Sequence, residues 1–285
     1  MAALWRERPV GLVGLGLIGG SLGLDLRAAG ADVRAWVHRE DTAARARERG
    51  LAQRVSTDAE VLADCALVVL ALPLDQLVAP SQALVGALPR QAVVTDVGSV
   101  KAPVLKAWRG LWPRFVAGHP MAGTSQAGVD AGQRDLFRDR PWVLTPEAGT
   151  DAEALAAVGD LAEAVGSRPL RCDAESHDRA VALISHLPVV VSAALLAAAD
   201  RGADAPAHTL VRALASSGFA DTTRVGGGNP ELGTLMCRHN RQAVLTALSL
   251  YETELAELAR AIRREDWAAL RGRLEHSKAI RPEFL

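Results

Sequence analysis

Short apolar runs alternate with helix-like segments over the first 172 residues. Several runs are unbroken rather than alternating, and the clearest is Val-Val-Leu-Ala-Leu at residues 68–72. Unbroken runs are typical of strands that are covered on both faces of a parallel sheet. The runs occupy residues 10–14, 33–37, 66–72, 92–97, 114–118, 142–145 and 168–172. Their alternation with helices predicts a Rossmann-type, doubly wound α/β domain over residues 1–172.

The segment 151–165 has the clearest helical pattern in this half of the chain. Thr150 and Glu153 form a T-x-x-E capping box, and Gly166 is placed to end the helix. The apolar positions share one stripe, formed by Leu155, Val158, Leu161 and Val165. We therefore expect an amphipathic helix here.

From about residue 173 the pattern is helical alone, which predicts an all-helical second domain over residues 173–285. One long helix carries an apolar seam with spacings of 4, 3, 4, 3 and 4, formed by Val244, Leu248, Tyr251, Leu255, Leu258 and Ile262. Such a seam suits core packing within the chain or a subunit interface. We favour the interface, and so expect a homodimer formed through the C-terminal helices.

Composition and charge narrow the class of protein. The chain has 285 residues, 49% apolar and 23% charged, which is enough for two domains with a core in each. Its 32 Lys and Arg against 33 Asp and Glu give a net charge of −1, which argues against a nucleic-acid binder and against an acidic disordered chain. The cysteines Cys65, Cys172 and Cys237 are far apart, so we expect a reducing cytosol and neither disulfides nor a thiolate zinc site.

No segment of the sequence predicts a membrane span or a signal peptide. The most apolar candidate, residues 187–199, covers 13 residues and contains Pro188 and Ser192. It is shorter than the roughly 18 residues of a spanning helix, so we interpret it as a buried core helix. The N-terminus carries Arg6, Glu7 and Arg8 and has no continuous apolar region. We therefore expect a soluble cytoplasmic protein with no membrane partner.

A glycine motif, G-x-G-x-x-G, follows the first apolar run and opens a helix. In it Gly14 makes a tight turn, Gly16 lets the backbone approach a pyrophosphate, and Gly19 lets the helix pack close to the strand. Leu17 and Ile18 complete the motif at the helix N-terminus. The alternative is a tight turn that binds nothing, but the strand–turn–helix context favours a dinucleotide site.

The end of the second strand reports on the choice of dinucleotide. An NAD site usually places Asp or Glu there, about 20 residues after the glycines, to bind the ribose 2′-hydroxyl. This chain has His38 and then Arg39, and a guanidinium pairs well with a 2′-phosphate. NADP is therefore favoured. If the register is wrong by one or two residues, Glu40 or Asp41 takes the ribose and NAD is the cofactor.

Polar clusters follow two predicted strands and recur in the helical half. They cover residues 95–101, 118–124, 177–178, 185–188 and 219–224. His119 is the best acid–base candidate, because it lies in a loop between Gly118 and Pro120 and its pKa class suits proton transfer near neutrality. The alternative is a histidine that stabilises a turn by bonding a backbone carbonyl.

Two residues of the helical half are candidates for contacting a substrate. Arg224 lies between a polar turn and three glycines, where it offers a fork to a carboxylate, with a surface salt bridge as the alternative. His186 heads an apolar helix and is equally well a pocket residue or a satisfied core histidine. Because His177, Asp178 and His186 lack H-E-x-x-H spacing, we predict no metal site.

Together these motifs resemble the prephenate/arogenate dehydrogenase family of tyrosine biosynthesis, and most closely its cyanobacterial-type arogenate dehydrogenases. The motifs run in order over nearly the whole chain. They are GLGLIGGSL at residues 14–22, DVGSVK at 96–101, HPMAGT at 119–124, SHLP at 185–188, ASSGF at 215–219, DTTR at 221–224 and GGGNPELG at 226–233. The later motifs are far more specific than the glycine fingerprint.

The resemblance implies an oxidative decarboxylation of arogenate to tyrosine, with NADP as the hydride acceptor. It implies that His119 accepts the proton of the 4-hydroxyl group and that Ser99 helps to orient that hydroxyl, His119 or the nicotinamide. It also implies that Arg224 binds a substrate carboxylate. The other pocket residues implied are Thr124, Ser125, His186 and Asp221.

Other functions are open at this point. Prephenate, converted to 4-hydroxyphenylpyruvate with NAD or NADP, is the main alternative substrate. Ser125 and Val189 fit the arogenate type, since some prephenate-using relatives carry an acid and a histidine at these positions. Another NADP-dependent dehydrogenase with a helical domain explains the glycine motif but not His119 with Arg224. In a non-catalytic NADP-binding sensor, His119, Ser99 and Arg224 together would be superfluous.

Overall fold

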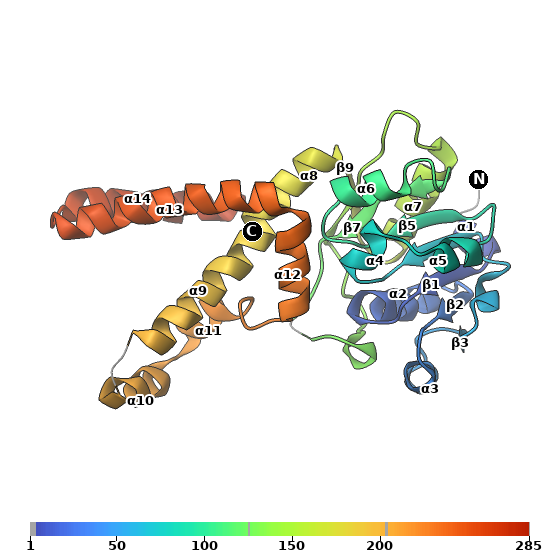
Figure 1. Cartoon of the computed structure of the whole chain (residues 1–285), viewed down its shortest axis with the longest axis horizontal. Helices are drawn as coiled ribbons and strands as arrows, with labels where there is room; N and C mark the ends of the chain where they lie inside the picture. The colour runs from blue at the N-terminus through green and yellow to red at the C-terminus, as the bar shows by residue number, and fades with distance from the viewer. Residues whose placement is uncertain (1–3, 125, 203–204, 285) are drawn as a thin grey trace.

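The computed structural model describes residues 4–124, 126–202 and 205–284. Figure 1 shows an α/β part that holds the strands and a helical part that extends away from it as two arms. The predicted fold class, a Rossmann-type sheet followed by helices, is confirmed.

Six parallel strands form the main sheet, in the order β3-β2-β1-β4-β5-β6. The bounds are β1 (Val10–Val13), β2 (Val33–Trp36), β3 (Arg54–Ser56), β4 (Leu67–Leu70), β5 (Val93–Asp96) and β6 (Phe115–Val116). The strand order reverses between β1 and β4, and the crevice at such a reversal is where Rossmann folds bind dinucleotides. Of these six strands, β3 is the one without a counterpart among the predicted runs.

The last three strands of the α/β part form a second, smaller sheet. It consists of β7 (Gly118–Pro120), β8 (Pro141–Leu144) and β9 (Arg168–Arg171), with β7 antiparallel and β9 parallel to β8. The run 114–118, predicted as one strand, is therefore two, because the chain leaves the main sheet at Ala117 and enters the small one. This change of sheet carries residue 119 out of the main sheet.

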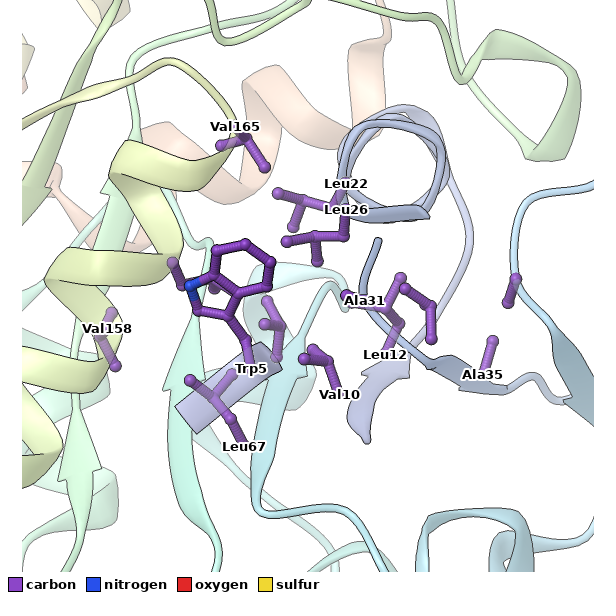
Figure 2. Close-up of a cluster of buried hydrophobic side chains, with 14 of the residues drawn as sticks. Trp5, Val10, Leu12, Leu22, Leu26, Ala31, Ala35, Leu67, Val158 and Val165 are labelled. Atoms are coloured by element: carbon purple, nitrogen blue, oxygen red, sulfur yellow. The ribbon is translucent and has the colours of Figure 1, made fainter. Parts of the chain in front are cut away.

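Both faces of the main sheet are buried, which explains its unbroken apolar runs. Along β4, Leu67 and Val69 face one core, whereas Val68 and Leu70 face the other. Figure 2 shows the first core, where Trp5 packs among side chains from two helices and the sheet.

The α-helices in the described residues of the α/β part are α1 (Leu4–Glu7), α2 (Leu17–Ala28), α3 (Glu40–Glu48), α4 (Leu74–Val78), α5 (Gln82–Ala87), α6 (Ala102–Trp108) and α7 (Ala152–Ala164). The predicted capping box of α7 is wrong. Asp151 is the N-cap, and its carboxylate accepts from the backbone N–H of Ala154. The Thr150 hydroxyl instead accepts from the N–H of Glu147, one turn earlier. Gly166 ends the helix with φ +79°, as expected.

The helical part contains α8 (Ala174–Val181), α9 (Leu187–Arg201), α10 (Ala205–Leu214), α11 (Ser217–Thr223), α12 (Pro230–His239), α13 (Arg241–Arg263) and α14 (Trp267–Ile280). A π-helical turn joins α8 and α9 into one helix of 28 residues. It is the one helix among the described residues that is long and apolar enough to cross a membrane. Ser192 alone is buried in α9, so the expectation of a buried core helix is wrong for the single chain.

The apolar seam of α13 starts in the core and runs out to the surface. Val244 is buried, whereas Leu255 and Ile262 are half exposed although α14 packs alongside. Ion pairs from Arg273 to Glu254 and Glu257 hold the two helices together. The single chain therefore leaves much of this seam uncovered.

Candidate functional site

The glycine loop between β1 and α2 has the geometry that the motif predicts. Gly14 has φ +91°, and a Cβ there would lie 2.5 Å from the carbonyl oxygen of Ala71. A Cβ on Gly19 would lie 2.1 Å from the carbonyl oxygen of Gly14, so only glycine allows this close approach of helix and strand. A Cβ on Gly16 would meet nothing within 4 Å. The loop is thus closed toward the protein and open at the N-terminus of α2, where an anion binds.

The end of β2 lies beside this loop, since the N–H of Gly14 donates to the carbonyl of Trp36. His38 and Arg39 follow directly and are exposed. Among the described residues Arg39 has no ion-pair partner, whereas the Glu40 carboxylate in the first turn of α3 is 2.8 Å from a guanidinium nitrogen of Arg47. Among the described residues the Arg39 guanidinium is therefore unpaired, and the Glu40 carboxylate is already paired with Arg47.

A buried ion pair at the end of β5 fixes the backbone just before His119. The side chains of Asp96 and Lys101 are fully buried and hydrogen-bonded to each other. Asp96 accepts from the N–H of Gly118 at 3.1 Å, and the Lys101 ammonium donates to the carbonyl of Gly118 at 2.6 Å. Both polar groups of one residue are thus clamped by this pair. The sequence analysis identified residues 95–101 as a polar cluster, but it assigned no role to Asp96 or Lys101.

His119 itself lies on β7 and is only 8% exposed, so the expectation of a loop position is wrong. Its Nδ1 is 2.8 Å from Nε2 of His177 on α8, and Nδ1 of His177 is 2.7 Å from Oδ1 of Asp178. Its ring thus bonds a second histidine, where the alternative interpretation had a backbone carbonyl. The partners His177 and Asp178 entered the sequence analysis only in the search for metal ligands.

Burial and neighbouring groups keep His119 and His186 neutral near pH 7. Burial, followed by the neighbouring His177, Lys101 and His186, holds the pKa of His119 well below its ordinary value. Burial likewise lowers the pKa of His186 to about 4. A neutral imidazole has a lone pair with which to accept a proton, and near pH 7 His119 is in that form.

Two polar atoms of predicted site residues are buried without a partner in the described structure, Oγ of Ser99 and Nε2 of His186. His186 is fully buried, and its Nδ1 is 3.2 Å from the amide nitrogen of Asn240, whose amide also donates to the carbonyl of Asp178. Buried polar atoms are normally paired, so these two atoms are available to a ligand.

The other predicted substrate residues are exposed and are not joined to this cluster. No hydrogen bond or ion pair within the described ranges links Thr124, Asp221 or Arg224 to His119. Ser125 lies outside the described residues. Arg224 makes no ion pair with a described residue, so the alternative of a surface salt bridge is not met. Gly226, two residues on, seats this turn on α9, because its N–H donates to the Ser192 hydroxyl at 2.8 Å.

No group of three His, Cys, Asp or Glu side chains in the described part of the chain is placed to hold a metal ion.

The glycine loop, the reversal of strand order between β1 and β4, and the neutral His119 are together typical of a dinucleotide-dependent oxidoreductase. The chain belongs to the prephenate dehydrogenase family. The family's nucleotide-binding domain matches residues 22–170, and its dimerization domain matches residues 173–276. The protein is thus an oxidoreductase of the family that contains prephenate, arogenate and cyclohexadienyl dehydrogenases.

Several members of the family are similar over most of the chain. Cyclohexadienyl dehydrogenase of Zymomonas mobilis is 34% identical, covering 94% of this chain and 92% of that protein. The crystal structure of Synechocystis arogenate dehydrogenase is 40% identical with a TM-score of 0.82, covering 97% of this chain and all of the other. Prephenate dehydrogenase from A. aeolicus, in complex with hydroxyphenyl propionate and NAD+, is 29% identical with a TM-score of 0.89 and covers 98% of both chains.

Proposed function

We propose that this enzyme oxidises and decarboxylates arogenate to tyrosine, with NADP+ as the hydride acceptor. A bound NADP+ would supply the acceptor for the hydride on ring carbon C4, and His119 would accept the proton of the C4 hydroxyl. The bond to the ring carboxylate breaks, CO2 departs, and the electrons of that bond complete the aromatic ring. The proton held on His119 then returns to the phenolic oxygen. Because aromatisation drives the reaction, the protein mainly orients the substrate, binds its carboxylates and holds one proton.

The buried, neutral His119 is the observation that carries this proposal. Its depressed pKa leaves the imidazole unprotonated near pH 7, as a proton acceptor must be. Ser99 and His186 support the pocket, since each has a buried polar atom that a substrate hydroxyl or carboxylate would satisfy. We assign Ser99 to orienting the hydroxyl or the nicotinamide. The remaining pocket assignments are His186, Thr124, Ser125 and Asp221.

Arogenate and prephenate differ only in the side chain, which carries an ammonium in one and a keto group in the other. The 40% identity with Synechocystis arogenate dehydrogenase favours arogenate. Prephenate is the second candidate, because the similar proteins of Bacillus subtilis and A. aeolicus are prephenate dehydrogenases.

The glycine loop fits a dinucleotide, and a relative's complex with NAD+ supports a nicotinamide cofactor. Gly14, Gly16, Leu17, Ile18 and Gly19 would hold its pyrophosphate at the N-terminus of α2. NADP is favoured over NAD on local charge, since Arg39 is unpaired at the strand end beside His38 while Glu40 is paired with Arg47.

We assign residues 1–172 to cofactor binding and residues 173–285 to substrate binding and dimerisation, in a cytoplasmic homodimer. The exposed apolar side chains of α9 and of the α13 seam support the dimer, because an interface there would remove Leu195, Leu255 and Ile262 from water. The match of residues 173–276 to the family's dimerization domain supports it independently.

A four-way assay tests the proposed function. Purified enzyme is given NAD+ or NADP+ with arogenate or prephenate, and reduced nicotinamide is followed by its absorbance. We expect the highest kcat/KM with arogenate and NADP+. A higher value with prephenate would identify the second candidate, and no turnover in any combination would exclude the enzymatic proposal.

Arg39→Ala is expected to weaken NADP+ binding and leave NAD+ binding almost unaltered, because only NADP+ carries the 2′-phosphate. Loss of one charge-assisted contact costs about 1.5–3 kcal/mol, which is roughly 10- to 150-fold in affinity. His38→Asp should move the preference further toward NAD+, since it repels the phosphate and accepts from the 2′-hydroxyl. The measurement is kcat/KM for both cofactors. Equal weakening of both by Arg39→Ala would point instead to Glu40 or Asp41 as the ribose ligand.

Arg224→Ala is expected to raise the substrate KM by roughly 10- to 150-fold while leaving the cofactor Kd unchanged, because a charge-assisted contact with a carboxylate is lost. Arg224→Lys should recover only part of the loss, since an ammonium does not reproduce a bidentate fork. Arg281→Ala, at an exposed position near the C-terminus, is the matched control. Unchanged saturation in both Arg224 variants would make Arg224 a structural residue.

A further inference from the structure

Three buried side chains form a continuous hydrogen-bonded line that ends at the proposed base. Oδ1 of Asp178 is 2.7 Å from Nδ1 of His177, and Nε2 of His177 is 2.8 Å from Nδ1 of His119. The three residues are between 3% and 8% exposed. The two rings are nearly perpendicular, at 77°, so the edge of one faces the next.

The direction of the protons along this line follows from Asp178. Its carboxylate accepts two backbone hydrogen bonds, from the N–H of Lys101 at 2.7 Å on Oδ1 and from the N–H of Ala102 at 2.9 Å on Oδ2. Both carboxylate oxygens thus act as acceptors at the start of α6, and a carboxylate offers its neighbours only acceptor atoms. The proton between Asp178 and His177 therefore sits on Nδ1 of His177, and Nε2 of His177 is left with a lone pair.

The proton position on His177 determines the proton position on His119. Since Nε2 of His177 accepts, Nδ1 of His119 carries the proton and donates it. Nε2 of His119 then has the free lone pair, and no described residue donates to it. The opposite tautomer would set two lone pairs against each other across 2.8 Å and leave the base with a proton on the wrong nitrogen.

We propose that Asp178 and His177 are positioning residues that hold His119 as the Nδ1–H tautomer, with Nε2 as the atom that accepts the substrate's proton. This inference rests on the proposed role of His119 as the base. The same chain of bonds stabilises the imidazolium that forms when Nε2 takes up the proton, because its positive charge lies two hydrogen bonds from the Asp178 carboxylate.

Other titratable groups also face His119, and they oppose its protonation. Lys101, from the segment after β5, and His186, from the turn before α9, both lower its pKa, as does His177 from α8. Asp96 neutralises Lys101 in their buried pair. Asp178 is thus the carboxylate that reaches His119 through a hydrogen-bonded partner, which makes the line the route for stabilising the transient cation.

His177 is the residue to change, because Asp178 also caps α6 and its replacement would disturb that helix. His177→Leu removes the acceptor for Nδ1–H of His119 at similar volume. His177→Gln keeps an acceptor, since the glutamine amide oxygen reaches the position of Nε2. Loss of one buried hydrogen-bond partner costs about 1–3 kcal/mol, which changes an equilibrium or rate constant by roughly 5- to 150-fold. We expect kcat to fall about 10- to 100-fold in His177→Leu, with KM little changed, and to stay within about fivefold of normal in His177→Gln.

The control is His276→Leu, at an exposed histidine on α14, which should leave kcat unchanged. Normal kcat in His177→Leu would overturn the proposal. Equal losses in the leucine and glutamine variants would also overturn it, because the cause would then be packing rather than proton direction.

A second readout is independent of turnover. Nitrogen-15 NMR of the histidine-labelled protein distinguishes the two tautomers, and His119 is assigned by the signal lost in His119→Asn. We expect Nδ1–H on His119 in the unchanged protein and a mixture of tautomers in His177→Leu. Nε2–H in the unchanged protein would overturn the proposal. If the tautomer is as expected but no substrate turns over, the proposed function is wrong, whereas the proton positions inferred for the hydrogen-bonded line are confirmed.

Discussion

His119→Asn is expected to lower kcat by roughly 10²- to 10⁴-fold, the usual contribution of a positioned acid–base group. The asparagine amide takes the place of Nδ1 and still donates to His177, so the surrounding contacts persist while the accepting Nε2 is lost. The cofactor Kd should be nearly unchanged, because the glycine loop is a separate structure on β1 and α2. Steady-state kinetics and a cofactor titration measure the two quantities.

The role of His119 also predicts how kcat/KM of the unchanged enzyme depends on pH. Below its pKa His119 is protonated and no longer accepts the hydroxyl proton, so kcat/KM falls as the pH is lowered. Because burial and the neighbouring His177, Lys101 and His186 depress that pKa, the fall should be centred below the ordinary histidine value of about 6.5. His276→Asn is the matched control. A His119→Asn enzyme within threefold of normal activity would remove His119 from the mechanism.

The second large effect concerns stability. Lys101→Met is expected to lower the free energy of unfolding by about 3–5 kcal/mol, because it leaves the buried Asp96 carboxylate without its cation. That is a large part of the ~5–15 kcal/mol typical of a folded domain. Urea unfolding monitored by circular dichroism measures it, with the slope of the transition checked for constancy.

The control for Lys101→Met is Arg271→Met on α14. Its pair with Glu275 is a single-turn contact between side chains that are 80% and 64% exposed, so the expected loss is under about 0.5 kcal/mol. Similar losses in the two variants would contradict the view that the Asp96–Lys101 pair is a structural clamp.

The main sheet was predictable because its strands are covered on both faces and contain long apolar runs. The strand β3 was missed because it is an edge strand of three residues with Arg54 and Ser56 at its ends. The strand β7 was missed for a different reason. Gly118 and Pro120 are poor strand formers, and their extended backbone depends on pairing with β8.

The sequence identified single candidate residues of the site but not the contacts between them. His119 stood out through its neighbours in sequence, but His177 lies 58 positions away, and no periodicity links the two. The exposure of α9 was also hidden, because an apolar helix that meets another subunit has the same sequence as one buried within its own chain.

The contact between His119 and His177 joins the two halves of the chain, since β7 belongs to the α/β part and α8 to the helical part. Asp178 adds to this junction by capping α6 across the same boundary. If the halves separate by even an ångström or two, the hydrogen bond to His119 is lost, and with it the orientation of the base. The junction therefore ties the orientation of the proposed base to the packing of α8 against the α/β part.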